Sequence, residues 1–276
     1  MLLKSNNWVG KKYNLHYYSC GDPEKPALVF LHGFLGSGLD WIEPIRALAD
    51  DFFCLAPDLP GHGKTRIKGS VSNYTMEIFA SEFVQFIKQT GLGVPNLLGY
   101  SMGGRIALYI AVHYPQYLDK LILESSSPGL RSPRDRQMRL AHDENLARKL
   151  ETININEFLA DWYVQPIFSS LKENKGFQAM LERRIEVDRA EAARTLRMMS
   201  TGRQEPLWDE LKAIKTPILL LAGDLDSKFS AIMKEMSEIS QTAVLSVIKN
   251  AGHNIHVEQP SLFVSNVSKF LKDQEI

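Results

Sequence analysis

Short apolar runs recur along the chain and are separated by segments with helical patterns. Most runs are apolar at successive positions, which is typical of strands in a parallel sheet that helices cover on both faces. An earlier run, residues 13–18, alternates and predicts an antiparallel hairpin at the sheet edge. We predict the other strands at residues 27–32, 52–56, 96–100, 119–124, 218–222 and 243–248.

Helical patterns fill the intervals between these strands. We predict helices near residues 41–49, 75–88, 101–113, 231–239 and 261–271. Strand–helix alternation of this kind predicts an α/β fold, in which helices flank a mostly parallel, twisted sheet.

The alternation stops between residues 126 and 205. This segment is helical and polar in pattern and predicts a helical cap, inserted into a core made of residues 1–125 and 206–276. It holds 14 Lys+Arg against 12 Asp+Glu, and 11 of those basic residues are Arg. Because a guanidinium binds carboxylates through a planar fork, two or three of these arginines are expected to face a ligand. The others are expected to form surface ion pairs.

Composition narrows the function classes. The 276 residues include 32 Lys+Arg and 32 Asp+Glu, and this zero formal charge disfavours nucleic-acid binding. With 44% hydrophobic and 23% charged residues, the chain has the composition of a globular protein. Cys20 and Cys54 are expected to be buried free thiols. No signal-peptide or membrane-spanning pattern occurs, which predicts a cytoplasmic protein.

The pentapeptide from Gly99 to Gly103 follows a predicted strand and opens a predicted helix. This is the context of the G-x-S-x-G nucleophile elbow, where a tight turn exposes a serine hydroxyl. Gly99 and Gly103 supply the small neighbours that such a turn needs, and the helix N-terminus favours developing negative charge. Ser101 is therefore the candidate catalytic serine.

Two later strands end near residues that complete a Ser…Asp…His order. Asp224 and Asp226 follow the strand at 218–222, and His253 follows the strand at 243–248. Both places are at strand carboxyl ends, where open α/β sheets form their sites. We predict the triad Ser101, Asp226 and His253, in which the imidazole takes the serine proton and the carboxylate orients it. Asp224 is the alternative acid, disfavoured because Gly-x-x-Asp is the usual spacing in this fold.

An early loop is expected to complete an oxyanion hole. It follows the strand at 27–32, and we predict that the backbone N–H groups of Phe34 and Met102 bind an oxygen that gains negative charge. His32 and His62 are expected to be structural.

Two other motifs are weak. The segment from Gly63 to Thr65 resembles the end of a P-loop, but Asp58 stands where the leading glycine belongs. His253 and His256 have a spacing seen in metal sites, but no third ligand cluster is evident, so no metal is expected.

Together these features resemble the α/β-hydrolase superfamily over nearly the whole chain. Finer motifs in both core and cap resemble the family of 2-succinyl-6-hydroxy-2,4-cyclohexadiene-1-carboxylate (SHCHC) synthases of menaquinone and phylloquinone biosynthesis. These motifs are Tyr100-Ser-Met-Gly-Gly-Arg105, Glu124-Ser-Ser-Ser-Pro-Gly-Leu130, Asp161-Trp-Tyr-x-x-Pro-x-Phe168, Leu196-Arg-x-Met-x-Thr-Gly-x-Gln-x-Pro-Leu-Trp208, Gly223-x-x-Asp-Ser-Lys-Phe229 and Gly252-His-Asn254.

The resemblance implies a lyase that eliminates pyruvate from 5-enolpyruvoyl-6-hydroxy-2-succinyl-cyclohex-3-ene-1-carboxylate, with the serine and histidine acting as a general base. It also implies a tricarboxylate substrate and no cofactor. Arg105 lies one helical turn beyond Ser101 and should point toward the pocket. The other substrate-binding positions that the resemblance implies are Tyr100, Arg139, Trp162 and Arg184, with Arg183 as the competitor of Arg184.

Two other functions remain open at this point. The same three catalytic side chains suit a serine hydrolase of esters or C–C bonds that forms an acyl-enzyme. The fold also hosts non-catalytic receptors for small ligands, although an intact triad would then be unused. The sequence predicts no oligomeric state.

Overall fold

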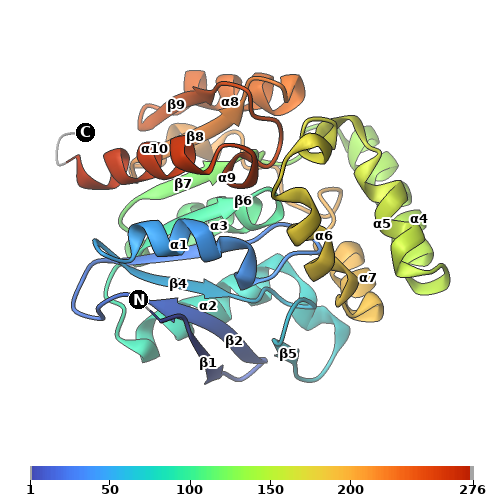
Figure 1. The fold of residues 1–276 in the computed structure, drawn as a ribbon, viewed down its shortest axis with the longest axis horizontal. Helices are drawn as coiled ribbons and strands as arrows, with labels where there is room; N and C mark the ends of the chain where they lie inside the picture. The colour runs from blue at the N-terminus through green and yellow to red at the C-terminus, as the bar shows by residue number, and fades with distance from the viewer. Residues whose placement is uncertain (1, 274–276) are drawn as a thin grey trace.

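In the computed structural model, which describes residues 2–273, a nine-stranded sheet crosses the molecule in the order β1-β2-β4-β3-β6-β7-β8-β9, with β5 paired to β2 (Figure 1). The sheet is mostly parallel, as predicted: neighbouring strands pair in parallel along the order β4-β3-β6-β7-β8-β9. Strand β2 runs antiparallel to β1, β4 and β5. The bounds are β1 Lys4–Val9, β2 Tyr13–Cys20, β3 Ala27–Leu31, β4 Phe53–Pro57, β5 Arg66–Ile67, β6 Asn96–Tyr100, β7 Leu121–Glu124, β8 Ile218–Gly223 and β9 Ala243–Ile248.

Helices cover both faces of this sheet (Figure 1). One apolar core joins the sheet to α2, α3 and α8, and a second joins its other face to α1, α9 and α10. Because both faces are covered, β3, β6, β7 and β8 are buried at every position. The helices are α1 Ile42–Leu48, α2 Met76–Thr90, α3 Met102–His113, α8 Ser227–Ile239, α9 Ile255–Glu258 and α10 Pro260–Lys272.

Four helices occupy the segment between β7 and β8, and a third apolar cluster holds them together. They lie beyond one end of the sheet, at the right of Figure 1. We call residues 126–205 the cap and propose that it covers the active site. Its helices are α4 Pro133–Thr152, α5 Ile155–Tyr163, α6 Phe177–Ile185 and α7 Arg189–Met198.

Short 3-10 helices join several of these elements. They are η1 Gly38–Trp41, η2 Val71–Tyr74, η3 Pro115–Tyr117, η4 Pro166–Phe168, η5 Leu171–Glu173 and η6 Glu210–Lys212. Within residues 2–273, no helix is long and apolar enough to cross a membrane. Cys20 and Cys54 face each other across β2 and β4 as buried free thiols.

Two elements differ from the prediction for physical reasons. Helix α8 begins at Ser227 rather than near residue 231, because the Asp226 side chain accepts a hydrogen bond from the backbone N–H of Phe229 and caps the helix. Strand β9 has the predicted bounds, but its faces are not both covered. It is the edge strand, and Val244 and Val247 are 51% and 45% exposed.

The buried sheet makes one direct stability prediction. Phe30 is fully buried in the second core and contacts Trp41, with ring centroids 5.3 Å apart. Phe30→Ala should lower the free energy of unfolding by about 3–5 kcal/mol, because it leaves a cavity between β3 and α1. Chemical denaturation measures this loss. The control Val94→Ala, at an exposed residue, should change it by less than about 0.5 kcal/mol. Equal losses in the two variants would contradict this packing.

Candidate active site

Ser101 lies in a tight turn between β6 and α3. Its backbone has φ 50° and ψ −107°, a conformation that side-chain-bearing residues rarely adopt. Glycines allow the close packing around this turn, since a Cβ on Gly103 would lie 2.2 Å from the carbonyl oxygen of Leu31. The same atom on Gly99 would lie 2.4 Å from the carbonyl oxygen of Gly103. The structure thus has the strained elbow that the sequence predicts.

Ser101, His253 and Asp226 form a chain of hydrogen bonds. The Nε2 atom of His253 lies 3.2 Å from the Ser101 hydroxyl, and its Nδ1 lies 2.7 Å from Oδ2 of Asp226. An ionised carboxylate only accepts, so Nδ1 donates its proton and Nε2 is left to accept from Ser101. The other oxygen of Asp226 caps α8, which fixes the carboxylate in place. This arrangement can withdraw a proton through the serine oxygen.

The alternative acid, Asp224, points elsewhere. One of its oxygens lies 3.4 Å from Nζ of Lys249, at the protein surface. It makes no hydrogen bond with His253 among residues 2–273. The geometry therefore favours Asp226 for the triad.

Aromatic side chains enclose the imidazole. His253 is 2% exposed, and its ring centroid lies 4.5 Å from that of Phe229, 5.5 Å from that of Tyr100 and 5.8 Å from that of Phe168. Phe168 comes from the cap, whereas the other two belong to the core. Cap and core together therefore shield the histidine from bulk water.

The backbone N–H groups of Phe34 and Met102 are free to bind a ligand. Met102 is the first residue of α3, so its N–H has no acceptor within the helix. Within the described chain, the N–H of Phe34 donates no hydrogen bond. Both residues line the same cavity as Ser101. These are the properties that an oxyanion hole requires.

His32 and His62 hold this early loop in place. His32 accepts a hydrogen bond from the N–H of Leu59, and His62 accepts one from the N–H of Leu35. Burial, and secondarily the neighbouring His32, lowers the pKa of His62 to about 3. Burial also lowers the pKa of His32. Both rings stay neutral at pH 7 and can accept these hydrogen bonds, which supports the structural roles that we expect for them.

The catalytic chain opens into a cavity of about 780 Å³ between core and cap. This is a normal size for a small-molecule site. Arg105 projects into it from α3 and donates hydrogen bonds to the Gln204 side chain and to the carbonyl of Met199. Neither partner is charged. Burial and the neighbouring Arg139 lower the pKa of Arg105 to about 10, so the guanidinium is still a cation at pH 7.

Arg139 lines the same cavity from α4. Its Nε lies 2.7 Å from Oδ1 of Asp143, a buried carboxylate that also accepts a hydrogen bond from the Ser200 hydroxyl. The Arg139 side chain is 37% exposed. Asp143 therefore binds the Nε side of the guanidinium, while the Arg139 side chain lines the cavity.

Ser101 also lines a smaller cavity of about 30 Å³. Tyr100, Trp162 and Arg184 line it, together with Asn254. Burial, and secondarily Glu124, raises the pKa of Tyr100 well above its usual value, so its hydroxyl is protonated and can donate. Trp162 packs against Phe34 with ring centroids 5.3 Å apart. The structure therefore brings all three predicted residues to the same cavity as Ser101.

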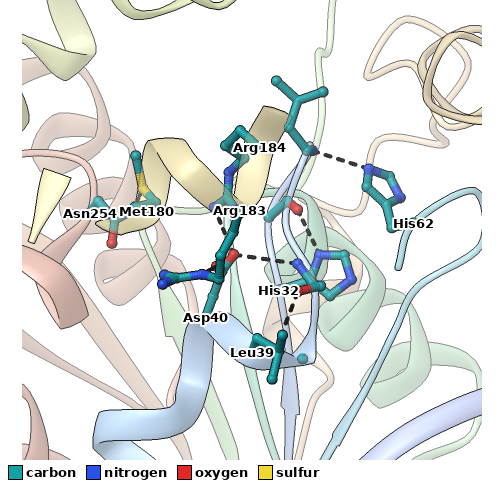
Figure 2. A network of polar contacts seen from close by, with 12 residues as sticks. His32, Leu39, Asp40, His62, Met180, Arg183, Arg184 and Asn254 are labelled. Carbon is teal, nitrogen blue, oxygen red and sulfur yellow. Dashed lines mark hydrogen bonds and ion pairs between the residues drawn. The ribbon is translucent and has the colours of Figure 1, made fainter. Parts of the chain in front are cut away.

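Arg184 already has a charged partner. Its guanidinium forms two hydrogen bonds with the carboxylate of Asp40, at 2.9 and 2.6 Å (Figure 2). Arg183 reaches the same carboxylate at 3.1 Å from a more exposed position. Burial raises the pKa of Asp40, but Arg184 outweighs it and holds the pKa well below its usual value. Because Asp40 belongs to η1 of the core and both arginines to α6, this ion pair joins cap to core.

Sequence reasoning missed the groups that support the histidine loop. Glu124, at the end of β7, accepts hydrogen bonds from the backbone N–H and from Nδ1 of His256, and both side chains are buried. Glu258 binds the backbone beside His253. Glu124 opens one of the motifs quoted above and Glu258 lies five residues after His253, but neither position indicated these contacts. Across residues 2–273, no cluster of three or more His, Cys, Asp or Glu side chains could hold a metal ion.

Comparisons with known proteins agree with this geometry. Residues 26–260 match the family described as alpha/beta hydrolase fold. The 2-succinyl-6-hydroxy-2,4-cyclohexadiene-1-carboxylate synthase of Serratia proteamaculans (strain 568) is 32% identical over 252 residues, which cover 91% of this chain and 95% of that enzyme. The solved structure titled "Structure of MenH from S. aureus" has a TM-score of 0.87 and 32% identity, and the match covers 95% of this chain and 98% of that one.

A plant relative is much longer. Protein PHYLLO, chloroplastic, of Arabidopsis thaliana is 33% identical over 263 residues. The match covers 90% of this chain but only 15% of that protein, so the chain spans a small part of its length.

The Asp40–Arg184 pair predicts a pH-dependent contribution to stability. Asp40→Asn leaves a buried guanidinium without its counterion and should lower the free energy of unfolding at pH 7 by about 3–5 kcal/mol. The carboxyl pKa is lower in the folded state, so the stabilisation is present above the unfolded value near 4 and is lost as pH falls below it. Urea denaturation between pH 3 and 7 measures this.

The exposed pair of Glu43 and Arg46 provides the control. Glu43→Gln should change the free energy of unfolding by less than about 1 kcal/mol at every pH. A difference between wild type and Asp40→Asn that stays constant down to pH 3 would contradict the ion pair.

Proposed function

The chain belongs to the α/β-hydrolase family and, within it, to the SHCHC synthases, and on this premise we propose that it is a carbon–oxygen lyase. Its reaction is the elimination of pyruvate from 5-enolpyruvoyl-6-hydroxy-2-succinyl-cyclohex-3-ene-1-carboxylate, which gives 2-succinyl-6-hydroxy-2,4-cyclohexadiene-1-carboxylate. This step belongs to the pathway toward menaquinone or phylloquinone. The similarity of the chain to bacterial relatives named SHCHC synthase supports the proposal.

The reaction begins with the proton on the ring carbon next to the succinyl ketone. Ser101 takes this proton while its own hydroxyl proton passes to Nε2 of His253, which lies 3.2 Å away. Asp226 stabilises the imidazolium that forms, through the 2.7 Å hydrogen bond to Nδ1. The net result is one proton moved from carbon to His253.

Loss of that proton converts the ketone into an enolate. The backbone N–H groups of Phe34 and Met102 bind the enolate oxygen, and each such donor contributes about 3–4 kcal/mol in related acyl-transfer sites. When the ketone re-forms, the ring double bond shifts and the bond from the ring to the enolpyruvoyl oxygen breaks. The departing enolate of pyruvate takes up a proton, so His253 can return to its neutral form.

Cations in the cavity recognise the carboxylates of the substrate. Arg105 is the strongest candidate, since its contacts in the structure are all to neutral groups. Arg139 supplies a second positive charge at the cavity wall. Tyr100, Trp162 and Arg184 shape the small cavity beside Ser101, with Arg184 held in place by Asp40. No nucleic-acid partner is part of this function.

The observation on which the proposal rests is that the catalytic chain and the Arg105 cation share one cavity. A hydrolase of esters could use the same triad and oxyanion hole, but it would not need a guanidinium one helical turn from the serine. The reaction moves a proton and breaks one carbon–oxygen bond without redox change, so we expect no cofactor. We also place the enzyme in the cytoplasm as part of the proposal.

The direct test supplies the enolpyruvoyl substrate and follows pyruvate by a coupled assay, with a p-nitrophenyl ester in a parallel assay. We expect rapid pyruvate release and slow ester turnover. Ser101→Ala and His253→Ala should each reduce pyruvate release by about 10²–10⁴-fold, because each removes part of the general base. The exposed Ser237 is the control, and Ser237→Ala should keep full activity. Fast ester hydrolysis without pyruvate would overturn the lyase assignment.

Arg105→Ala tests carboxylate recognition separately. We expect kcat/KM to fall by about 10²-fold or more, because hydrogen bonds to a charged group are lost in a buried site. The free energy of unfolding should stay within about 1 kcal/mol of wild type. Arg105→Lys should recover only part of the activity, since an ammonium lacks the planar fork.

The exposed cap residue Arg148, paired with Glu144, provides the matched control. Arg148→Ala should leave kcat/KM unchanged. A loss of stability in Arg105→Ala that accounts for all its loss of activity would make Arg105 a structural residue.

A further inference from the structure

The loop between β9 and α9 holds His253, and one carboxylate binds it on both sides of that residue. Oε2 of Glu258 accepts a hydrogen bond from the backbone N–H of Gly252 at 2.9 Å. Its Oε1 accepts one from the N–H of Asn254 at 3.2 Å. A single side chain therefore binds the backbone N–H groups of the residues immediately before and after His253.

This carboxylate is buried without a cation. Glu258 is 7% exposed and takes part in no ion pair among residues 2–273. Burying an uncompensated charge is costly, and the two N–H donors offset only part of that cost. Glu82 has a similar environment, so burial alone does not distinguish Glu258; its distinguishing feature is that both of its oxygens bind the backbone on either side of His253.

Other contacts hold the loop at different points. The Asn254 side chain donates to the sulfur of Met180 in the cap (Figure 2), and the Asn174 side chain donates to the backbone carbonyl of Glu258. Glu124 binds His256. None of these three contacts involves the N–H of Gly252 or of Asn254. The peptide group that carries the Gly252 N–H is also held by its carbonyl, since that of Ala251 accepts a hydrogen bond from the N–H of Leu225 at 2.9 Å.

We propose that Glu258 is the positioning residue of the catalytic histidine, which it serves both by fixing the loop backbone and by placing a negative charge beside the imidazolium that forms during the reaction. The proposal rests on the function above, in which His253 receives the proton. Asp226, Tyr100 and Ser101 are the other ionisable or polar groups that face the ring. Asp226 orients the imidazole, whereas Glu258 orients the backbone from which it projects.

Two variants separate the two effects. Glu258→Gln keeps the size of the side chain but removes the charge and turns one acceptor into a donor. We expect kcat to fall about 10–100-fold with KM within about twofold of wild type. The acid limb of the pH–rate profile should move to lower pH by about one unit, because the imidazolium loses a neighbouring negative charge.

Glu258→Asp keeps the charge but is too short to reach both N–H groups. Its kcat should also fall, about 10-fold, while the acid limb of its pH–rate profile should stay near that of wild type. Each variant therefore has its own signature.

Glu82 provides a matched control. It is another buried carboxylate, 8% exposed, and it accepts a hydrogen bond from the backbone N–H of Lys12 far from the site. Glu82→Gln should lower stability to a similar degree and leave kcat and the pH–rate profile unchanged. If Glu258→Gln behaves like Glu82→Gln, then Glu258 is only structural and the proposal is wrong.

A measurement without substrate keeps this test independent of activity. The ¹⁵N NMR titration of the His253 ring in the whole protein should shift to lower pH in Glu258→Gln and not in Glu82→Gln. Identical titrations in all three proteins would overturn the proposal even if one variant were inactive. If wild type releases no pyruvate but the His253 titration still shifts, then the proposed function fails while the positioning role stands.

Discussion

The hydrogen bond between His253 and Asp226 is the constraint on which the rest of the site depends. At 2.7 Å and with both groups almost fully buried, it fixes the imidazole tautomer that leaves Nε2 open toward Ser101. The parallel order of β6, β8 and β9 then decides where these residues meet, because the carboxyl ends of the strands lie at one edge of the sheet. The strained backbone of Ser101 directs its hydroxyl toward His253 at that edge.

Charged and aromatic side chains surround the hydrogen-bonded chain of Ser101, His253 and Asp226. The cap supplies aromatic walls and cations, and it is joined to the core where Arg184 meets Asp40. In a site shielded from water, fixed cations and backbone N–H groups interact strongly with carboxylates and with a developing enolate. The same shielding makes a buried charge expensive, and three buried carboxylates have an ionisable partner: Asp226 has His253, Asp143 has Arg139, and Glu124 has His256. Glu258 has backbone partners instead, and these flank His253.

The central strands and the turn at Ser101 were predictable from sequence, because short local patterns indicate them. Apolar runs gave the central strands, and Gly99 to Gly103 gave the elbow, because tight turns demand small residues at fixed spacing. The spacing after the strand predicted Asp226 as the triad acid but did not indicate that its side chain caps α8, so the predicted helix began too late. The pairing of Asp40 with Arg184 joins residues 144 positions apart, and no local pattern indicates such a contact. The edge position of β9 depends on which strands pair, which an apolar run does not reveal.

The central claim is that Ser101 removes a proton from carbon and does not attack a carbonyl group. It is tested most directly with substrate that carries deuterium on the ring carbon next to the succinyl ketone. Intact-protein mass spectrometry follows the enzyme during turnover. The account predicts that deuterium slows pyruvate release by a primary isotope effect under single-turnover conditions, with no covalent adduct on Ser101. An accumulating adduct on Ser101, with pyruvate release insensitive to deuterium, would contradict it.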